Sequence, residues 1–287
     1  MINKTQISKF KSDGYLHIKN FFDENEIKIF SKAVNEQKTL FENDGVDNTA
    51  DIPEVWDFIN HSEMLSVIRS LLVDKIFYMH DTTILSGSTN ITPNYTWHRD
   101  NPCRKTGVGP DWNLDEKYNV VSSAVYLTDS NSTLNVIKKS HFKNYKYTLS
   151  NILRVIQNRL RNKKKFSFLK SIIESLIGKH LKYGAGDLIV FYTTLYHTGS
   201  ATESSENSSR DTILSRYGGE GNHAKNFLNY EINYRNGMEK YKISKKKEIF
   251  FQKLKDNSIY ISPEVTKEKI DGIFIPKNTD GDSIYKK

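Results

Sequence analysis

The sequence contains very little cysteine and no long apolar run. Cys103 is the single cysteine among 287 residues, which excludes an internal disulfide and a zinc site built from several thiolates. No apolar run is long enough to cross a bilayer, and the residues after Met1 lack the apolar stretch of a signal peptide. We therefore expect a cytoplasmic protein, because a single thiol suits a reducing compartment.

Acidic residues are scarce in one stretch of the chain. The net charge is +8, but residues 143–182 hold 11 Lys or Arg and the single acid Glu174, so this stretch carries +10 and the rest −2. Because the basicity is local, we expect no general nucleic-acid binding. Two interpretations stay open. One is a solvated helical pair with a charged outer face, and the other is a surface for an anionic substrate or for acidic membrane headgroups.

The hydrophobic pattern predicts a chain that is mainly β with flanking helices. Strands are predicted at 15–18, 75–80, 82–85, 120–127, 134–137, 187–192, 195–200 and 210–217, and helices at 1–13, 23–34, 61–73 and 149–181, with weak helix signals at 223–256. Residues 40–53 are polar and are predicted to form a loop. We expect one domain, with a core at about 75–217, a basic helical insertion at about 143–182 and a C-terminal extension at 218–287.

A short motif, His98-Arg99-Asp100, is the first candidate for chemistry. On an extended strand, side chains two residues apart point to the same face, so His98 and Asp100 would converge on one point. Two histidines and one carboxylate form the facial triad of non-haem Fe(II) oxygenases. The motif therefore predicts a metal site that needs one further histidine.

His197 is the candidate for that third ligand, because it follows an apolar strand and precedes Gly199. An arginine is the natural partner for the carboxylate of a 2-oxo acid, since its planar fork binds both oxygens. Arg210 is preferred because it lies nearer to His197, and Arg216 is the second candidate, on the same face of the predicted strand. Each signal is weak alone, but their joint order on β-like segments is much stronger.

The chain resembles the phytanoyl-CoA dioxygenase family of Fe(II)- and 2-oxoglutarate-dependent oxygenases. The resemblance covers about residues 5–217 and implies a double-stranded β-helix, which is a cupin-like jelly roll flanked by helices. It rests on Phe10–Tyr15, Asn20–Phe22, Trp97–Asp100, Tyr126–Asp129, Leu134–Ile137, Ser140–His141, Gly186–Asp187, His197–Ser200 and Arg210.

The resemblance also implies the site and the reaction. His98, Asp100 and His197 would bind Fe(II), and Arg210 would bind the C5 carboxylate of 2-oxoglutarate. With O2, such a site hydroxylates a small molecule and releases succinate and CO2. Halogenases of this fold have a small residue in place of Asp100, so a carboxylate there favours hydroxylation.

Two alternatives to hydroxylation stay open. One is a catalytically silent jelly-roll binding module. The other keeps the iron chemistry but ends in desaturation, epimerisation or cyclisation. The substrate is expected to be a small, anionic metabolite or a lipid- or glycan-linked molecule, and the oligomeric state is left open.

Overall fold

The computed structural model describes residues 2–44, 52–73, 75–86, 97–100, 119–129, 133–160, 163–200, 211–221, 224 and 245–261. Its helices are α1 (Lys4–Asp13), α2 (Glu24–Asp44), α3 (Pro53–Ile59), α4 (Ser62–Leu72), α6 (Leu149–Leu160), α7 (Ser167–Ile177) and α9 (Lys245–Asp256). Short 3-10 turns occupy Lys143–Tyr147 and Lys164–Phe166. The strands are β1 (Tyr15–Ile18), β2 (Ile76–Leu85), β3 (Val120–Tyr126), β4 (Thr133–Val136), β5 (Lys179–Lys182), β6 (Leu188–Tyr192), β7 (His197–Ser200) and β8 (Thr212–Gly219).

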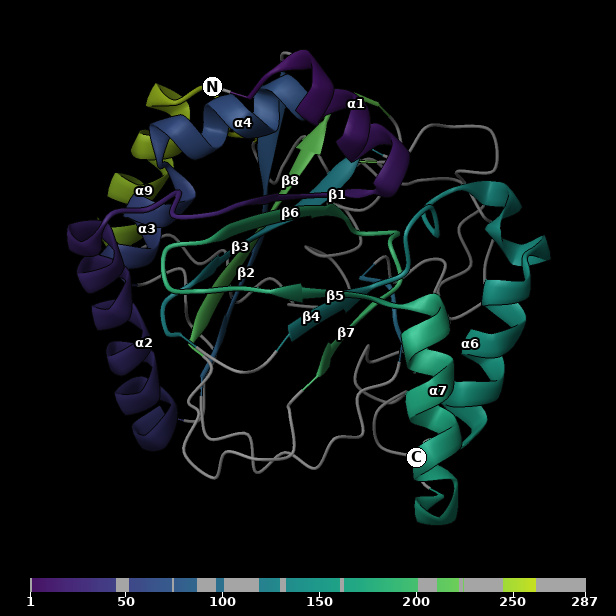
Figure 1. Cartoon of the computed structure of the whole chain (residues 1–287). Coiled ribbons are helices and arrows are strands. Elements are labelled where there is room, and N and C mark those ends of the chain that lie inside the picture. The colour runs from purple at the N-terminus through teal and green to yellow at the C-terminus, as the bar shows by residue number, and fades with distance from the viewer. Residues whose placement is uncertain are drawn as a thin grey trace, which may run out of the picture.

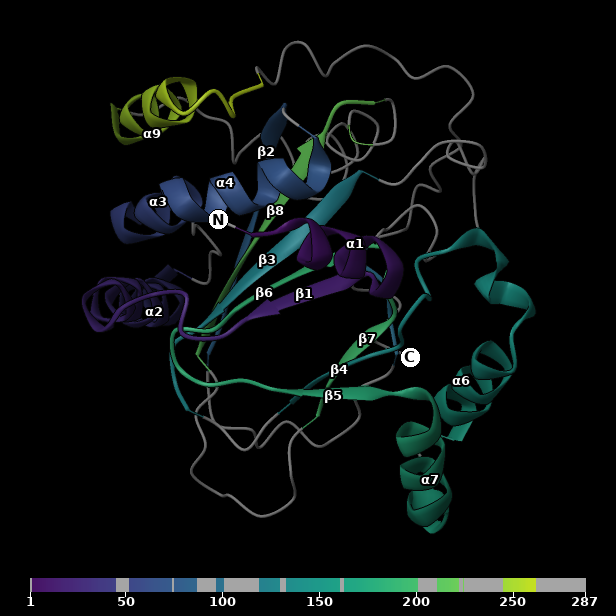
Figure 2. The same ribbon diagram turned by 45° about the horizontal axis from the view of Figure 1, so that its top comes forward.

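The strands form two antiparallel sheets. The larger sheet has the order β1-β6-β3-β8-β2, and the smaller one has the order β5-β4-β7. Figures 1 and 2 show the small sheet lying against one face of the large sheet, with α1 to α4 and α9 on the other side. The arrangement is the predicted jelly roll with flanking helices.

Two apolar clusters hold these layers together. Between the large sheet and the helices, Phe30, Ile68, Val125 and Leu188 belong to one cluster. Between the two sheets, side chains from β3, β4, β5 and β6 form a second cluster, which includes Phe191. Alternate residues of a strand point to opposite faces, so the large sheet contributes to both clusters.

Local sequence signals explain several boundaries. Asp23 and Glu26 form the predicted capping box, with Glu26 N donating to Asp23 Oδ1 at 2.9 Å and Asp23 N donating to Glu26 Oε2 at 2.9 Å. Helix α1 ends at Gly14, whose φ of +89° is readily adopted by glycine. A Cβ there would lie 2.5 Å from the ring of His141, so the close packing also requires glycine.

Two predicted boundaries were wrong. The loop expected at 40–53 is shorter, because α2 continues to Asp44 and α3 begins at Pro53, which suits the first turn of a helix. The helix expected to reach Leu181 ends at Ile177, with Gly178 as its C-cap, and residues 179–182 form β5 against β4. Only Leu181 of that strand is buried, so its sequence carries little alternation to signal a strand.

Candidate metal centre

The Trp97–Asp100 segment lies against the outer edge of the small sheet. His98 and His197 form an antiparallel bridge in which each amide donates to the other's carbonyl at 3.0 Å. The amide of Asp100 donates to the carbonyl of Thr193 at 2.8 Å. Main-chain hydrogen bonds therefore join two segments that lie about one hundred residues apart in the sequence.

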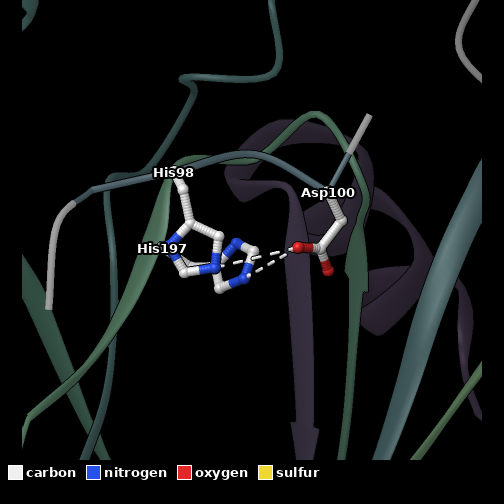
Figure 3. A group of neighbouring side chains, drawn as sticks. All are labelled: His98, Asp100 and His197. Carbon is white, nitrogen blue, oxygen red and sulfur yellow. Dashed lines mark ion pairs between the residues drawn. The ribbon is translucent and has the colours of Figure 1, made fainter. Parts of the chain in front are cut away.

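The three predicted metal ligands converge on one point, as Figure 3 shows. Nε2 of His98 lies 3.8 Å from Oδ1 of Asp100, and Nε2 of His197 lies 3.5 Å from the same oxygen. One ligand atom from each residue lies within 4.8 Å of the other two. Two imidazole nitrogens and one carboxylate oxygen are the donor set that non-haem Fe(II) sites use, and this set could hold such an ion.

The hydrogen bond made by Nδ1 of His197 leaves Nε2 as the nitrogen that can bind a metal. Its Nδ1 lies 3.0 Å from the carbonyl oxygen of Leu195, which can only accept, so Nδ1 carries the proton. In the neutral imidazole, Nε2 is then the nitrogen without a proton, and it is directed toward Asp100. The side chain of His197 is 8 % exposed and that of His98 is 27 % exposed, so His98 is the less buried of the two histidines.

The second oxygen of Asp100 is held by the large sheet. Nη2 of Arg216, on β8, lies 3.2 Å from Oδ2 of Asp100, and the hydroxyl of Ser122 lies 3.4 Å from it. Arg216 also forms an ion pair with Asp81, and both side chains are buried. A buried cation between two carboxylates leaves one net negative charge, which a divalent metal at Oδ1 would offset.

Asp81 reaches this ion pair from an irregular part of β2. The pairing of β2 with β8 shifts between Tyr78 and Thr82, and His80 between them has a φ of +53°. Such bulges redirect side chains next to functional sites. Burial lowers the pKa of His80 to about 4, so this imidazole, which lies against Tyr78 and Phe251, is neutral at physiological pH.

The arginines that were predicted to bind the co-substrate have different outcomes. Arg216 lies in the site and contacts the metal-ligand carboxylate, which the sequence analysis did not foresee. Its predicted contact with 2-oxoglutarate stays a prediction. Arg210 lies outside the described residues. The sequence does carry a signal for the ion pair, because Asp81 and Arg216 are charged residues within otherwise apolar or uncharged strands.

Helix α6 holds the residue before the first histidine. The side chain of Asn158 pairs with both main-chain groups of Trp97, accepting from its amide at 3.2 Å and donating to its carbonyl at 3.1 Å. Gln157 accepts the indole N–H of Trp97 at 2.7 Å. The helical insertion is thus anchored directly to the metal-binding segment.

The residue before the second histidine is held in a similar way. The guanidinium groups of Arg99 and Arg154 lie 4.1 and 4.0 Å from the ring centroid of Tyr196. The hydroxyl of Ser140 accepts from the Tyr196 amide at 2.8 Å. Ser140 therefore has a structural role, because it holds the backbone next to His197.

The family model for phytanoyl-CoA dioxygenase (PhyH) matches residues 10–211. The match spans more than half of the sequence and includes all three candidate ligands. The chain therefore belongs to the phytanoyl-CoA dioxygenase family, which confirms the family expected from the motifs. The predicted cofactors, Fe(II) and 2-oxoglutarate, are those of this family. Among curated proteins, no significant match was found.

Several solved structures share the fold. They include the non-heme alpha ketoglutarate dependent carbocyclase SnoK from nogalamycin biosynthesis, at 16% identity and a TM-score of 0.55, covering 76% of this chain and 84% of that one. The epimerase SnoN from the same biosynthesis has 11% identity and a TM-score of 0.52, covering 75% and 82%. HygX from Streptomyces hygroscopicus, with nickel and 2-oxoglutarate bound, has 18% identity and a TM-score of 0.55, covering 76% and 88%. These similarities confirm the jelly-roll fold.

Within the described part of the chain, no helix combines the length and apolar character needed to cross a membrane. The cytoplasmic location and the division into core, insertion and extension stay predictions.

Proposed function

We propose that the protein is an Fe(II)- and 2-oxoglutarate-dependent dioxygenase that hydroxylates a small molecule. The observation that carries the proposal is the convergence of His98, Asp100 and His197, whose ligand atoms lie within 4.8 Å of one another. Membership of the phytanoyl-CoA dioxygenase family supports the same chemistry. Iron and 2-oxoglutarate, when bound, supply the oxidising power: 2-oxoglutarate is decarboxylated to succinate and CO2 while O2 oxidises a substrate C–H bond.

In this proposal, the protein's residues bind and orient the metal and the co-substrate, and they exclude water from the site. The proton on Nδ1 of His197 keeps Nε2 available to the metal, and Arg216 holds Oδ2 of Asp100 so that Oδ1 faces the two imidazoles. Arg210 binds the C5 carboxylate of 2-oxoglutarate through its planar fork. Arg210 lies two residues before β8 in the sequence, and β8 carries Arg216 into the site, which supports this role.

Hydroxylation is preferred over halogenation because Asp100 provides a carboxylate ligand. A small residue in its place would leave a position for halide, so the carboxylate argues against halogenation. The fold alone does not separate hydroxylation from ring formation or epimerisation, since SnoK is described as a carbocyclase and SnoN as an epimerase. Product analysis by mass spectrometry distinguishes them, because hydroxylation adds one oxygen atom to the substrate.

The first test needs no substrate. Under anaerobic conditions, Fe(II) and 2-oxoglutarate should give the protein a weak visible charge-transfer band, and air should then produce succinate slowly. The band should disappear in His197→Ala and shift in Arg210→Ala. His180→Ala, an exposed histidine on β5, is the matched control and should keep the band.

The absence of both the band and succinate from the wild-type protein would refute the proposed function and favour a silent binding module. A screen of succinate release across small anionic metabolites would then identify the substrate of an active protein.

A further inference from the structure

The exposed apolar side chains gather on the helical insertion. Among the described residues, 13 large apolar side chains are exposed, and nine of them lie between Phe142 and Leu176. The most exposed of these are Tyr147, Phe168, Leu176 and Leu149, at 79%, 78%, 69% and 68%. Scattered apolar residues are normal on a protein surface, but a concentration of this size marks an interaction site.

Both helices of the insertion expose an apolar stripe. Helix α6 has no buried residue, although Leu149, Ile152 and Ile156 recur at helical spacing. Helix α7 buries Ile173 and Ile177 against Trp97 and exposes Phe168 and Leu176. Figures 1 and 2 show α6 and α7 side by side at one edge of the molecule, away from the other helices.

The charge around these stripes has one sign. Glu174 is the only acid between residues 143 and 182, and it accepts a hydrogen bond from Asn135 in the buried part of β4, so it faces inward. Lysines with exposed side chains flank the stripes at Lys146, Lys163, Lys165, Lys179 and Lys182. The outward surface therefore combines apolar side chains with positive charge alone.

We propose that α6, α7 and the turn before α6 dock onto the surface of an anionic lipid bilayer. A nucleic acid would account for the lysines but not for the exposed leucines and isoleucines, because it offers no apolar phase. Lysine is depleted from the cores of protein–protein interfaces. A bilayer accepts both features: the apolar side chains enter the acyl boundary, and the lysines extend to the anionic headgroups.

The opposite face of the same insertion connects the docked surface to the metal centre. Asn158 and Gln157 of α6 hold Trp97, which directly precedes His98. Docking through the outer face would place the metal centre close to the headgroups. The substrate class that fits this placement is an amphiphile presented by the membrane. The docking does not depend on the proposed oxidation, because it uses none of the metal ligands.

Flotation of the full-length protein with lipid vesicles tests the proposal. The protein should bind vesicles of 70% phosphatidylcholine and 30% phosphatidylglycerol, bind pure phosphatidylcholine at least tenfold more weakly, and lose affinity as salt is raised. The variant Phe168→Ser with Leu176→Ser should bind at least tenfold more weakly. Lys163→Glu with Lys165→Glu should lose more than tenfold, because each lysine near the surface contributes roughly fivefold.

Matched controls lie on the other side of the molecule. Ile29→Ser with Ile249→Ser removes exposed apolar residues of α2 and α9, and Lys28→Glu with Lys32→Glu makes the same charge change on α2. Both should bind like the wild type, and unchanged circular dichroism should show that all variants are folded.

Absence of binding to the anionic vesicles at low salt would overturn the proposal, as would equal losses in the insertion variants and their controls. A different pattern would also overturn the proposal: the lysine variant loses binding to heparin, a soluble polyanion, while the Phe168 and Leu176 variant binds vesicles like the wild type. That pattern would point to an acidic soluble partner. Loss of succinate formation with vesicle binding retained would refute only the proposed function.

Discussion

The two sheets differ in what covers them. Every residue of β3 and β6 in the large sheet is buried, because helices pack on one face and the small sheet on the other. In the small sheet, three of the four residues of β5 are exposed. Its last strand, β7, carries His197 and pairs with the segment that holds His98. Stability is thus concentrated in the large sheet, and the metal donors lie at the edge of the small one.

The difference shows how a small sheet with one exposed strand, β5, can hold an exact arrangement of ligands. The large sheet supplies Arg216 and Ser122 to fix one oxygen of Asp100, and α6 supplies Asn158 to fix the segment before His98. Hydrogen bonds and ion pairs to these neighbours hold the metal-binding segment in place. Mutations should therefore separate stability from chemistry.

The largest effect on stability is expected in the large sheet. Leu188 is fully buried in β6, so Leu188→Ala should lower the free energy of unfolding by on the order of 4 kcal/mol. Turnover per folded molecule should stay unchanged, because the side chain belongs to the cluster on the helix side of the sheet. Urea unfolding and succinate assays on the same preparation measure both quantities.

Leu85→Ala is the matched control, since Leu85 lies at the end of β2 in the same sheet and is 41% exposed. It should cost less than about 1 kcal/mol. A large fall in turnover per folded molecule in Leu188→Ala would contradict the expectation that the large sheet governs stability without affecting the chemistry.

The next effect concerns pH. The folded-state pKa of His80 is lowered to about 4 by burial, so the unfolded chain binds a proton near pH 6.5 that the folded chain rejects. Stability from this residue is complete above pH 6.5 and is lost as the pH falls toward 4, by about 3 kcal/mol. Unfolding free energies measured between pH 7 and pH 4 should show this loss.

His80→Asn should flatten that pH dependence, because asparagine does not titrate and tolerates the positive φ of this position. His180→Asn, on the exposed strand β5, should leave the slope as it is. An unchanged slope in His80→Asn would show that other groups are responsible for the acid sensitivity.

The smallest effect is expected where α6 supports the metal segment. Asn158→Ala removes both hydrogen bonds to the main chain of Trp97 and should weaken Mn²⁺ binding about tenfold, because loosely held ligands bind more weakly. Isothermal titration calorimetry measures the affinity. Ile156→Ala, on the exposed side of α6, should bind the metal like the wild type. Equal affinities in both variants would mean that α6 does not position the ligands.

The sequence contained most of the fold and the candidate ligands, but little of what supports them. The strand predicted at 187–192 contains the unbroken apolar run 188–192, and residues 120–127 are rich in valine, so both carry strong local signals. His98, Asp100 and His197 could be identified because two histidines and one carboxylate in this order are the donor set of a non-haem Fe(II) site. Arg216 could be proposed as a site residue, although its ion pairs with Asp81 and Asp100 were not foreseen.

The remaining features depend on contacts between distant segments. Asn158 and Gln157 are ordinary polar residues on an amphipathic helix, and only the packing of α6 against Trp97 gives them a role. Strand β5 forms because β4 offers an edge, and nothing within residues 179–182 requires it. Short elements of this kind are determined by their neighbours more than by their own propensity.

The paired main-chain hydrogen bonds between His98 and His197 have a consequence for how the metal is acquired. The two imidazoles can meet only after a loop of about one hundred residues has closed, so the unfolded chain has no comparable site. The metal then binds the native state and not the unfolded chain, so its binding stabilises the native state. At a free metal concentration one hundred times Kd, it raises the free energy of unfolding by about 2.7 kcal/mol. The free metal concentration would therefore affect the fraction of the protein that is folded as well as its catalytic activity.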